Sequence, residues 1–160
     1  MAEQKTNVMR FLDQKKVPYI PHEYPHGDEA VDGVTVAGLI GKEPESVFKT
    51  LVARGASKSV YVFVIPVRHE LDLKRAAKAA GEKSVEMVRV SEINALTGYV
   101  RGGCSPLGAK KAYPVYLDAS AEKQSTISIS AGKRGEQIVL APADLIRAAN
   151  ATVAKLNRHA

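Results

Sequence analysis

The sequence predicts a single α+β domain built on a mixed β-sheet, with about seven strands and about five helices. Short apolar segments with the alternation of strands are interleaved with segments that have the apolar spacing of amphipathic helices. Some strand segments are joined by connections as short as residues 55–58, which suit a hairpin, so a purely parallel sheet is excluded. The 160 residues contain no internal repeat and no linker, so we expect one domain over residues 1–160.

The expected helices carry recognisable start and stop signals. Thr6 and Ser91 can each cap the start of a helix, Asp72 begins another, and Pro142 suits the first position of the last one. A glycine follows three of these segments and can end a helix in the left-handed conformation. The predicted helices span residues 6–16, 32–40, 72–80, 91–98 and 142–156.

The expected strands differ in how apolar they are. Residues 60–67 form the most apolar segment, which predicts a central position in the sheet. Pro21 cannot donate a backbone hydrogen bond, so the extended segment that contains it is expected at an edge. The predicted strands span residues 19–24, 47–54, 60–67, 85–88, 113–118, 126–130 and 137–140.

The charge and the cysteine count limit the classes of function. The formal net charge of +6 favours an anionic partner, with nucleic acid as the obvious class, although a basic protein without such a partner has the same composition. The single Cys104 excludes an intramolecular disulfide and a cysteine-based metal cage. His22 and His26 have a helical metal-ligand spacing, but Pro21 and Pro25 break the helix that this spacing needs. We therefore expect neither a metal nor a cofactor.

The apolar segments are short, and the usual catalytic motifs of hydrolases and nucleotide-binding enzymes are missing. The start of the chain has no apolar signal region, and no apolar run approaches the length of a membrane span. A cytoplasmic protein without a membrane partner is therefore expected.

Two glycine-rich loops are the strongest candidates for a binding site. The first covers residues 102–108 and the second residues 130–135, and each is expected at the end of a strand. Paired basic residues accompany them, Lys110-Lys111 and Lys133-Arg134. Loops of this composition direct several backbone N–H groups into one small space, where they can bind an anion or a developing oxyanion. We expect the two loops to form one shared site.

Lys49 is an unusual residue within an apolar strand. Alternation places it on the same face as Val47 and Leu51 and opposite to Phe48 and Thr50. If that face is inward, Lys49 enters the core or a cleft and needs an anionic partner. The alternative is an edge strand with an outward lysine that prevents pairing with other chains.

Five short motifs in one order resemble the YbaK/EbsC family of aminoacyl-tRNA deacylases, which is related to the editing domain of bacterial prolyl-tRNA synthetases. The resemblance extends from about Thr6 to Leu156. The motifs are Phe-Lys-Thr-Leu at 48–51, Leu-Asp-Leu-Lys at 71–74, Thr-Gly-Tyr-Val at 97–100, Gly-Gly-Cys-Ser-Pro-Leu-Gly at 102–108 and Gly-Lys-Arg-Gly at 132–135. The resemblance implies a barrel-like mixed sheet surrounded by helices. It also implies an enzyme that hydrolyses mischarged Cys-tRNA(Pro), binds the tRNA acceptor end and has prolyl-tRNA synthetase as a conceivable partner.

The resemblance also implies roles for individual residues. The essential lysine of the family falls on Lys49, its neighbouring threonine on Thr50, its pocket tyrosine on Tyr24 and its loop serine on Ser130. Main-chain N–H groups near Gly102, Gly103 and Ser130 would stabilise the oxyanion. The remaining substrate-binding residues are expected in the two loops, at Cys104, Ser105, Pro106, Gly132, Lys133 and Arg134.

Two positions differ from the family pattern and leave the amino-acid preference open. Ala131 replaces a glycine, and Gln137 stands where the family often has an acidic residue. Cys104 occupies a position that is commonly aliphatic in the family, which favours a non-catalytic thiol over a nucleophile. The resemblance implies that the thiol of the bound cysteine attacks its own ester. The alternatives are an Ala-tRNA(Pro) deacylase that uses water and a tRNA-binding module without turnover. The oligomeric state is left open.

Overall fold

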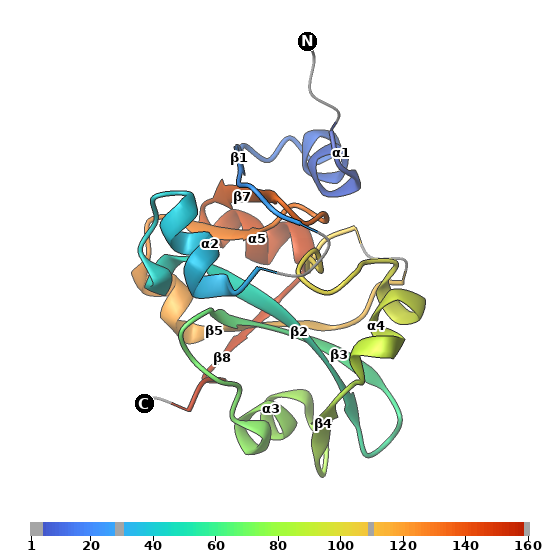
Figure 1. Ribbon diagram of the computed structural model, residues 1–160. Helices are drawn as coiled ribbons and strands as arrows, with labels where there is room; N and C mark the ends of the chain where they lie inside the picture. The colour runs from blue at the N-terminus through green and yellow to red at the C-terminus, as the bar shows by residue number, and fades with distance from the viewer. Residues whose placement is uncertain (1–4, 28–30, 109–110, 159–160) are drawn as a thin grey trace.

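The computed structural model describes residues 5–27, 31–108 and 111–158, in which eight strands form two sheets (Figure 1). The larger sheet has the strand order β4-β2-β3-β5-β8, and the smaller has the order β1-β7-β6. The two sheets do not close on each other, so the expected barrel-like single sheet is corrected to two sheets. The strands are β1 (Ile20–Glu23), β2 (Phe48–Gly55), β3 (Val60–Pro66), β4 (Val85–Met87), β5 (Val115–Asp118), β6 (Ile127–Ser130), β7 (Glu136–Leu140) and β8 (Thr152–Ala154).

The pairing of the strands confirms that the larger sheet is mixed. Strands β2 and β3 form an antiparallel hairpin, whereas β3 pairs with β5 and β5 with β8 in parallel. The apolar β3 is the middle strand of the five, as its composition predicts. Strand β1, which contains Pro21, is an edge of the smaller sheet, as expected.

Helices flank the sheets, and the ends of most of them match their sequence signals. Thr6 accepts a hydrogen bond from Met9 N at the start of α1, and Asp72 accepts from Lys74 N and Arg75 N at the start of α3. Gly81 and Gly98 end α3 and α4 in the left-handed conformation. The helices are α1 (Asn7–Gln14), α2 (Gly33–Leu39), α3 (Leu73–Ala80), α4 (Val90–Thr97) and α5 (Pro142–Ala149), with 3-10 helices at Pro44–Ser46 and Ala119–Lys123. None of these helices has both the length and the apolar character needed to cross a lipid bilayer.

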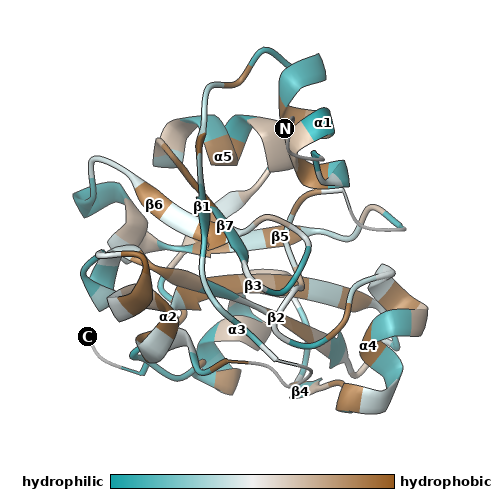
Figure 2. Cartoon of the chain, turned by 45° about the horizontal axis from the view of Figure 1, so that its top comes forward, coloured by the Kyte–Doolittle hydropathy of each residue, from teal (hydrophilic) through white to brown (hydrophobic). Residues whose placement is uncertain are grey.

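Two apolar clusters lie on opposite faces of the larger sheet. One joins Val62 and Val64 of β3 to Ile129 and Ile138 of the smaller sheet and to helices α1 and α5. The other joins Phe63 of β3 to α3 and to the C-terminal segment. Because β3 is buried on both faces, most of its residues are strongly apolar, and brown predominates along it in Figure 2. The smaller sheet and the larger one are therefore held together through a shared core.

Three of the expected elements are wrong in extent or type. The last helix ends at Ala149 and not near Leu156, because Asn150 takes a left-handed conformation and the chain then forms β8 beside β5. Helix α4 begins at Val90, one residue before Ser91, which was the expected cap. The Glu92 side chain caps its start by accepting a hydrogen bond from the Arg89 N–H. The first glycine-rich loop follows helix α4 and not a strand.

Asp118 fixes this C-terminal segment to the end of β5. Its buried carboxylate accepts hydrogen bonds from the backbone N–H groups of Leu156 and Asn157, at 2.8 and 3.1 Å, and from the Asn157 side chain. Burial opposes ionisation, but these bonds and those from Ser120 outweigh it and hold the pKa of Asp118 below its usual value.

Replacing Asp118 with alanine should lower the free energy of unfolding by roughly 3 kcal/mol, because at least two buried N–H groups lose their acceptor. The depressed pKa means that this contribution is present above the pKa of the unfolded state, near 4, and is lost as the pH falls through the folded-state pKa. Urea unfolding of the wild type and the variant at pH 7 and at pH 3 measures both effects. A loss below about 1 kcal/mol at pH 7 would show that the segment is held by other contacts.

Candidate active site

A cavity of about 870 Å³ opens where the edges of the two sheets meet. Val47, which directly precedes β2, forms an isolated parallel bridge with Ser128 of β6. Strand β4 covers β2 only at residues 53–55, so residues 48–51 border the cavity on the open side of β2. We call this cavity, which lies between residues 48–51 and the Ser130 end of β6, the seam. Its volume is in the range of small-ligand sites.

The backbones of both strands are directed into the seam. Val47 O accepts a hydrogen bond from Val67 N, so the odd-numbered residues of β2 bond to β3, and the N–H and C=O of Thr50 point away from β3. On β6, Ala131 N donates to Glu136 O across the pair with β7, so the backbone groups of Ser130 point toward β2. A ligand in the seam therefore lies between main-chain polar groups of both sheets.

The wall of the cavity on the β6–β7 side is polar although it is buried. Ser128, Ser130 and Gln137 share one face of the pair, because Ser130 lies directly opposite Gln137 in the register. The opposite face carries Ile129 and Ile138 and belongs to the core. Ser128 Oγ donates to Gln137 Oε1 at 2.9 Å, and Ser130 Oγ accepts from Gly132 N at 3.1 Å. Strand alternation thus sends a polar row toward the ligand and an apolar row toward the core.

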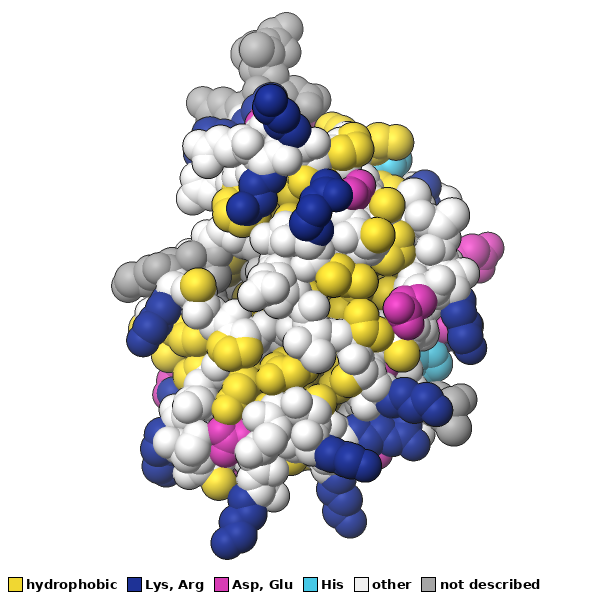
Figure 3. Space-filling view, turned by 180° about the vertical axis from the view of Figure 1, so that it is seen from behind, with side chains coloured by type: hydrophobic (Ala, Val, Ile, Leu, Met, Phe, Trp, Pro, Cys, Tyr) yellow, Lys and Arg dark blue, Asp and Glu magenta, His cyan; other side chains and the backbone are white. Residues whose placement is uncertain are grey.

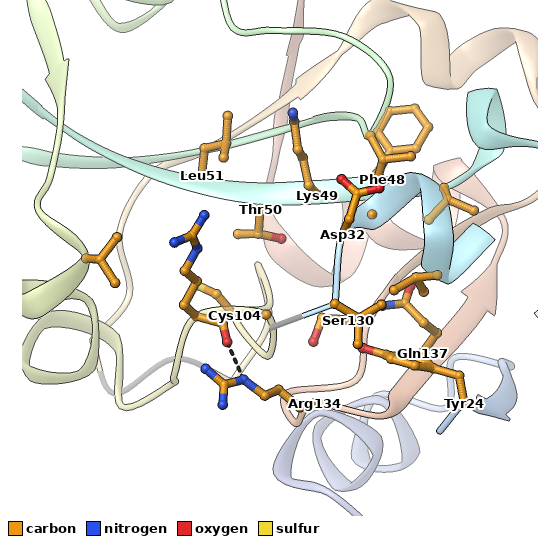
Figure 4. A pocket seen from close by; sticks show the side chains of 18 residues that line it. Tyr24, Asp32, Phe48, Lys49, Thr50, Leu51, Cys104, Ser130, Arg134 and Gln137 are labelled. Atoms are coloured by element: carbon orange, nitrogen blue, oxygen red, sulfur yellow. Dashed lines mark hydrogen bonds between the residues drawn. The ribbon is translucent and has the colours of Figure 1, made fainter. Parts of the chain in front are cut away.

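The two glycine-rich loops meet at the mouth of the seam. A Cβ atom at Gly103 would lie 3.0 Å from Arg134 N and 3.2 Å from the Lys133 Cα, so only glycine allows this approach without movement. Arg134 Nε donates to Arg101 O at 2.7 Å and ties the loops together, as the dashed line in Figure 4 shows. The N–H of Gly103 itself donates to Val100 O and stays within its loop.

Lys49 and Thr50 border the cavity from opposite sides of β2 (Figure 4). The Lys49 side chain rises on the side away from Ser130, as strand alternation predicts, and it is half-buried. Burial lowers the pKa of Lys49, and the negative charges of Glu70 and Asp32 oppose this effect. Lys49 is thus a partly desolvated cation at the rim, which favours an anionic ligand.

The Thr50 side chain lies on the other side of β2 from Lys49, the side on which Cys104 and Ser130 lie (Figure 4). Its Oγ1 is buried and has no hydrogen-bond partner among the residues that the structure describes. A buried hydroxyl without a partner costs about 1–3 kcal/mol.

Cys104 has the properties of a packing residue. Burial raises the pKa of its thiol to about 11, although a hydrogen bond with Thr97 has the opposite effect. At neutral pH the side chain is therefore a protonated thiol, which is a poor nucleophile.

Replacing Cys104 with alanine should leave the rate of any reaction at this site within a few-fold of the wild type. Single-turnover assays of the two proteins at equal concentration measure this. A covalent adduct on Cys104 in the wild type, together with an inactive alanine variant, would instead assign a nucleophile to this thiol.

The structure brings most of the predicted site residues to one cavity. Its lining includes the predicted residues Tyr24, Lys49, Thr50, Gly102, Cys104, Ser130 and Arg134. The other predicted residues are not in the lining but belong to the same two loops: Gly103, Ser105, Pro106, Gly132 and Lys133. Lys110, half of one predicted basic pair, lies outside the described residues.

Sequence reasoning missed two charged residues of the cavity, Asp32 and Arg101. Asp32 caps helix α2 by accepting a hydrogen bond from Thr35 N, so its sequence signal is that of a helix start. Arg101 directly precedes the first glycine-rich loop, and that position was its only signal. With Lys49 and Arg134, the described lining carries three cations and one carboxylate. On the face in Figure 3, lysine and arginine side chains lie near the top, at the left edge and most densely at the lower right.

The chain resembles known proteins along nearly all of its length. The family described as "Aminoacyl-tRNA editing domain" matches residues 28–148. A relative from Enterococcus faecalis, named "Putative Cys-tRNA(Pro)/Cys-tRNA(Cys) deacylase EbsC", is 46% identical over 155 residues, which cover 97% of this chain and 94% of that protein. The protein YwhH of Bacillus subtilis is 30% identical over 109 residues, or 68% of this chain and 69% of its own.

A solved structure supports the same assignment at the level of the fold. The "Crystal structure of a putative trans-editing enzyme for prolyl tRNA synthetase" superposes with a TM-score of 0.82 at 23% identity, covering 98% of this chain and 99% of that one. The match covers nearly the whole length of both chains. The chain therefore belongs to the aminoacyl-tRNA editing domain family, in the YbaK/EbsC group that its five sequence motifs resemble.

Proposed function

We propose that this aminoacyl-tRNA deacylase hydrolyses Cys-tRNA(Pro) in trans, after a synthetase has released the mischarged tRNA. The observation that carries the proposal is the seam, a cavity of about 870 Å³ bordered by main-chain polar groups, a polar wall and three cations. An aminoacyl ester at the 3′ end of a tRNA combines a small amino acid, a carbonyl group and phosphates. The relative at 46% identity is named for Cys-tRNA(Pro) and Cys-tRNA(Cys), which supports cysteine as the amino acid.

The proposed reaction needs no nucleophile from the protein. The thiol of the bound cysteine attacks its own carbonyl carbon, so that a C–S bond forms and the ester C–O bond breaks. The 3′ oxygen of the ribose leaves with the proton of the thiol, and water then opens the thiolactone to free cysteine. The protonated and buried Cys104 is consistent with this route, because it is poorly suited to attack the ester itself.

In this proposal the protein contributes orientation and charge stabilisation. The backbone of Ser130 and the loop at Gly102 lie beside the carbonyl group, where polar groups fixed before the reaction stabilise the developing oxyanion. Lys49 holds the phosphate or ribose of the terminal nucleotide at the rim. Proline esters lack a thiol and are therefore spared.

Purified protein and tRNA(Pro) charged separately with cysteine, alanine and proline test the proposal. We expect rapid deacylation of the cysteinyl form and no acceleration of the prolyl form over the spontaneous rate. Preference for alanyl-tRNA(Pro) would assign a water-dependent deacylase, and binding without turnover would assign a tRNA-binding module. A parallel series with prolyl-tRNA synthetase added shows whether this enzyme is a partner.

A further inference from the structure

The side-chain amide of Gln137 lies at the wall of the seam with its oxygen toward Ser128. Gln137 is only 6% exposed and lines the cavity from β7. Its Oε1 accepts the hydrogen bond from Ser128 Oγ at 2.9 Å. Because an amide has its oxygen and its nitrogen on opposite sides of one carbon, this bond directs the Nε2 group away from Ser128.

The Nε2 group of Gln137 has no hydrogen-bond partner among the described residues, yet it is not sealed from the cavity. A buried amide donor without a partner is costly unless a ligand or water accepts its hydrogen bond. An N–H donor suits an acceptor, such as a carbonyl oxygen or an oxyanion, and does not suit an ammonium group. The amide is therefore prepared for an electron-rich atom of the ligand.

The hydroxyl group of the neighbouring Ser130 can also donate a hydrogen bond to a ligand. It lies directly opposite Gln137 in the β6–β7 register, and its Oγ already accepts a hydrogen bond from Gly132 N. Its hydroxyl hydrogen is thus the group that it can offer to a ligand. Gly103, by contrast, uses its N–H within the loop, at Val100 O. One expected main-chain donor is therefore engaged, and the side chains of the polar wall offer others.

We infer that the Gln137 amide is an oxyanion donor of the deacylation reaction and that Ser128 is the positioning residue that orients it. This assignment rests on the proposed function and identifies which group meets the ester carbonyl. Nε2 would donate to the carbonyl oxygen as negative charge develops on it during attack by the substrate thiol. A glutamate in the same place would present an acceptor at neutral pH and repel that charge, so relatives with an acidic residue at this position would need another oxyanion donor, and the assignment concerns this chain.

The test compares Gln137→Glu and Gln137→Leu with the wild type in single-turnover deacylation of Cys-tRNA(Pro). At pH 8 both variants should lose about 10²- to 10³-fold in the maximal rate constant, while the protein concentration at half-saturation changes by only a few-fold. The rate constant of the Glu variant, divided by that of the wild type at the same pH, should rise as the pH falls, because a protonated carboxyl group can donate a hydrogen bond. The same ratio for the Leu variant should stay constant. Ser128→Ala should show a smaller loss of the rate constant.

Gln14→Glu, at an exposed position of α1, is the control for the added negative charge and should behave as the wild type. The Leu variant keeps the test valid if the Glu variant does not fold, which thermal melting shows. An active wild type together with a fully active Leu variant would overturn this assignment alone. A change in the half-saturating protein concentration with an unchanged maximal rate constant would also overturn it, because Gln137 would then serve binding only. A wild type without deacylase activity would overturn the proposed function and this assignment with it.

Discussion

Replacing Lys49 with alanine is expected to reduce the deacylation of Cys-tRNA(Pro) by about 100-fold or more, with little change in stability. Lys49 is a half-buried cation at the rim of the cavity, and burial lowers its pKa. Among the described residues it forms no salt bridge that the fold would lose. Its main partner should therefore be the anionic substrate, and single-turnover kinetics with thermal melting measure both expectations.

Two further variants make this result specific. Lys49→Arg should also be slow, because a planar guanidinium differs from an ammonium in shape and hydration. Lys74→Ala removes the same charge from the exposed face of α3 and should leave the rate unchanged. A Lys49→Ala variant with the rate of the wild type and a normal melting curve would remove Lys49 from the site.

A valine at Gly103 is expected to lower the deacylation rate by at least about tenfold and to destabilise the fold by about 1–3 kcal/mol. The Cβ of a larger residue would lie 3.0 Å from Arg134 N and 3.2 Å from the Lys133 carbonyl carbon, and both atoms belong to the backbone of the other loop. Because backbone cannot rotate away as a side chain can, the two loops must separate. The rate and the urea midpoint are the measurements.

Gly38→Ala is the matched control for this substitution. A Cβ at Gly38 meets open space in helix α2, so alanine should leave the activity intact and preserve or raise the stability. Equal activity of the Gly103→Val variant and the wild type would mean that contact between the loops is not needed for the reaction.

The fold could be predicted from the sequence wherever a local signal decided the structure. The apolar run of β3 predicts a central strand, Pro21 predicts an edge, and Thr6 and Asp72 mark helix starts. Each of these signals depends only on the segment that carries it, either on its backbone hydrogen bonds or on the burial of its side chains. The sequence motifs likewise identify the family, because five of them occur in the order that the family has.

The remaining features depend on contacts between distant segments. Strand β8 pairs with β5, and Asp118 at the end of β5 accepts hydrogen bonds from Leu156 and Asn157, about 40 residues away; no local pattern marks these contacts. The cavity exists because the residue before β2 shares one bridge with β6 and the two strands then separate, which depends on the placement of two sheets. Arg101 lies in the lining, and its carbonyl oxygen accepts a hydrogen bond from Arg134 of the second loop, 33 residues away in the chain.

The exchange of cysteine for serine on the same tRNA tests the central claim, which is that the substrate supplies its own nucleophile. The two amino acids differ little in size, so Ser-tRNA(Pro) and Cys-tRNA(Pro) should bind with similar half-saturation, while the seryl ester should react far more slowly because a hydroxyl is the weaker nucleophile. The measurement is the single-turnover rate constant of each ester with the wild-type protein at one pH. A large excess of the cysteinyl rate is the predicted result, and equal rates would contradict self-attack and require an activated water.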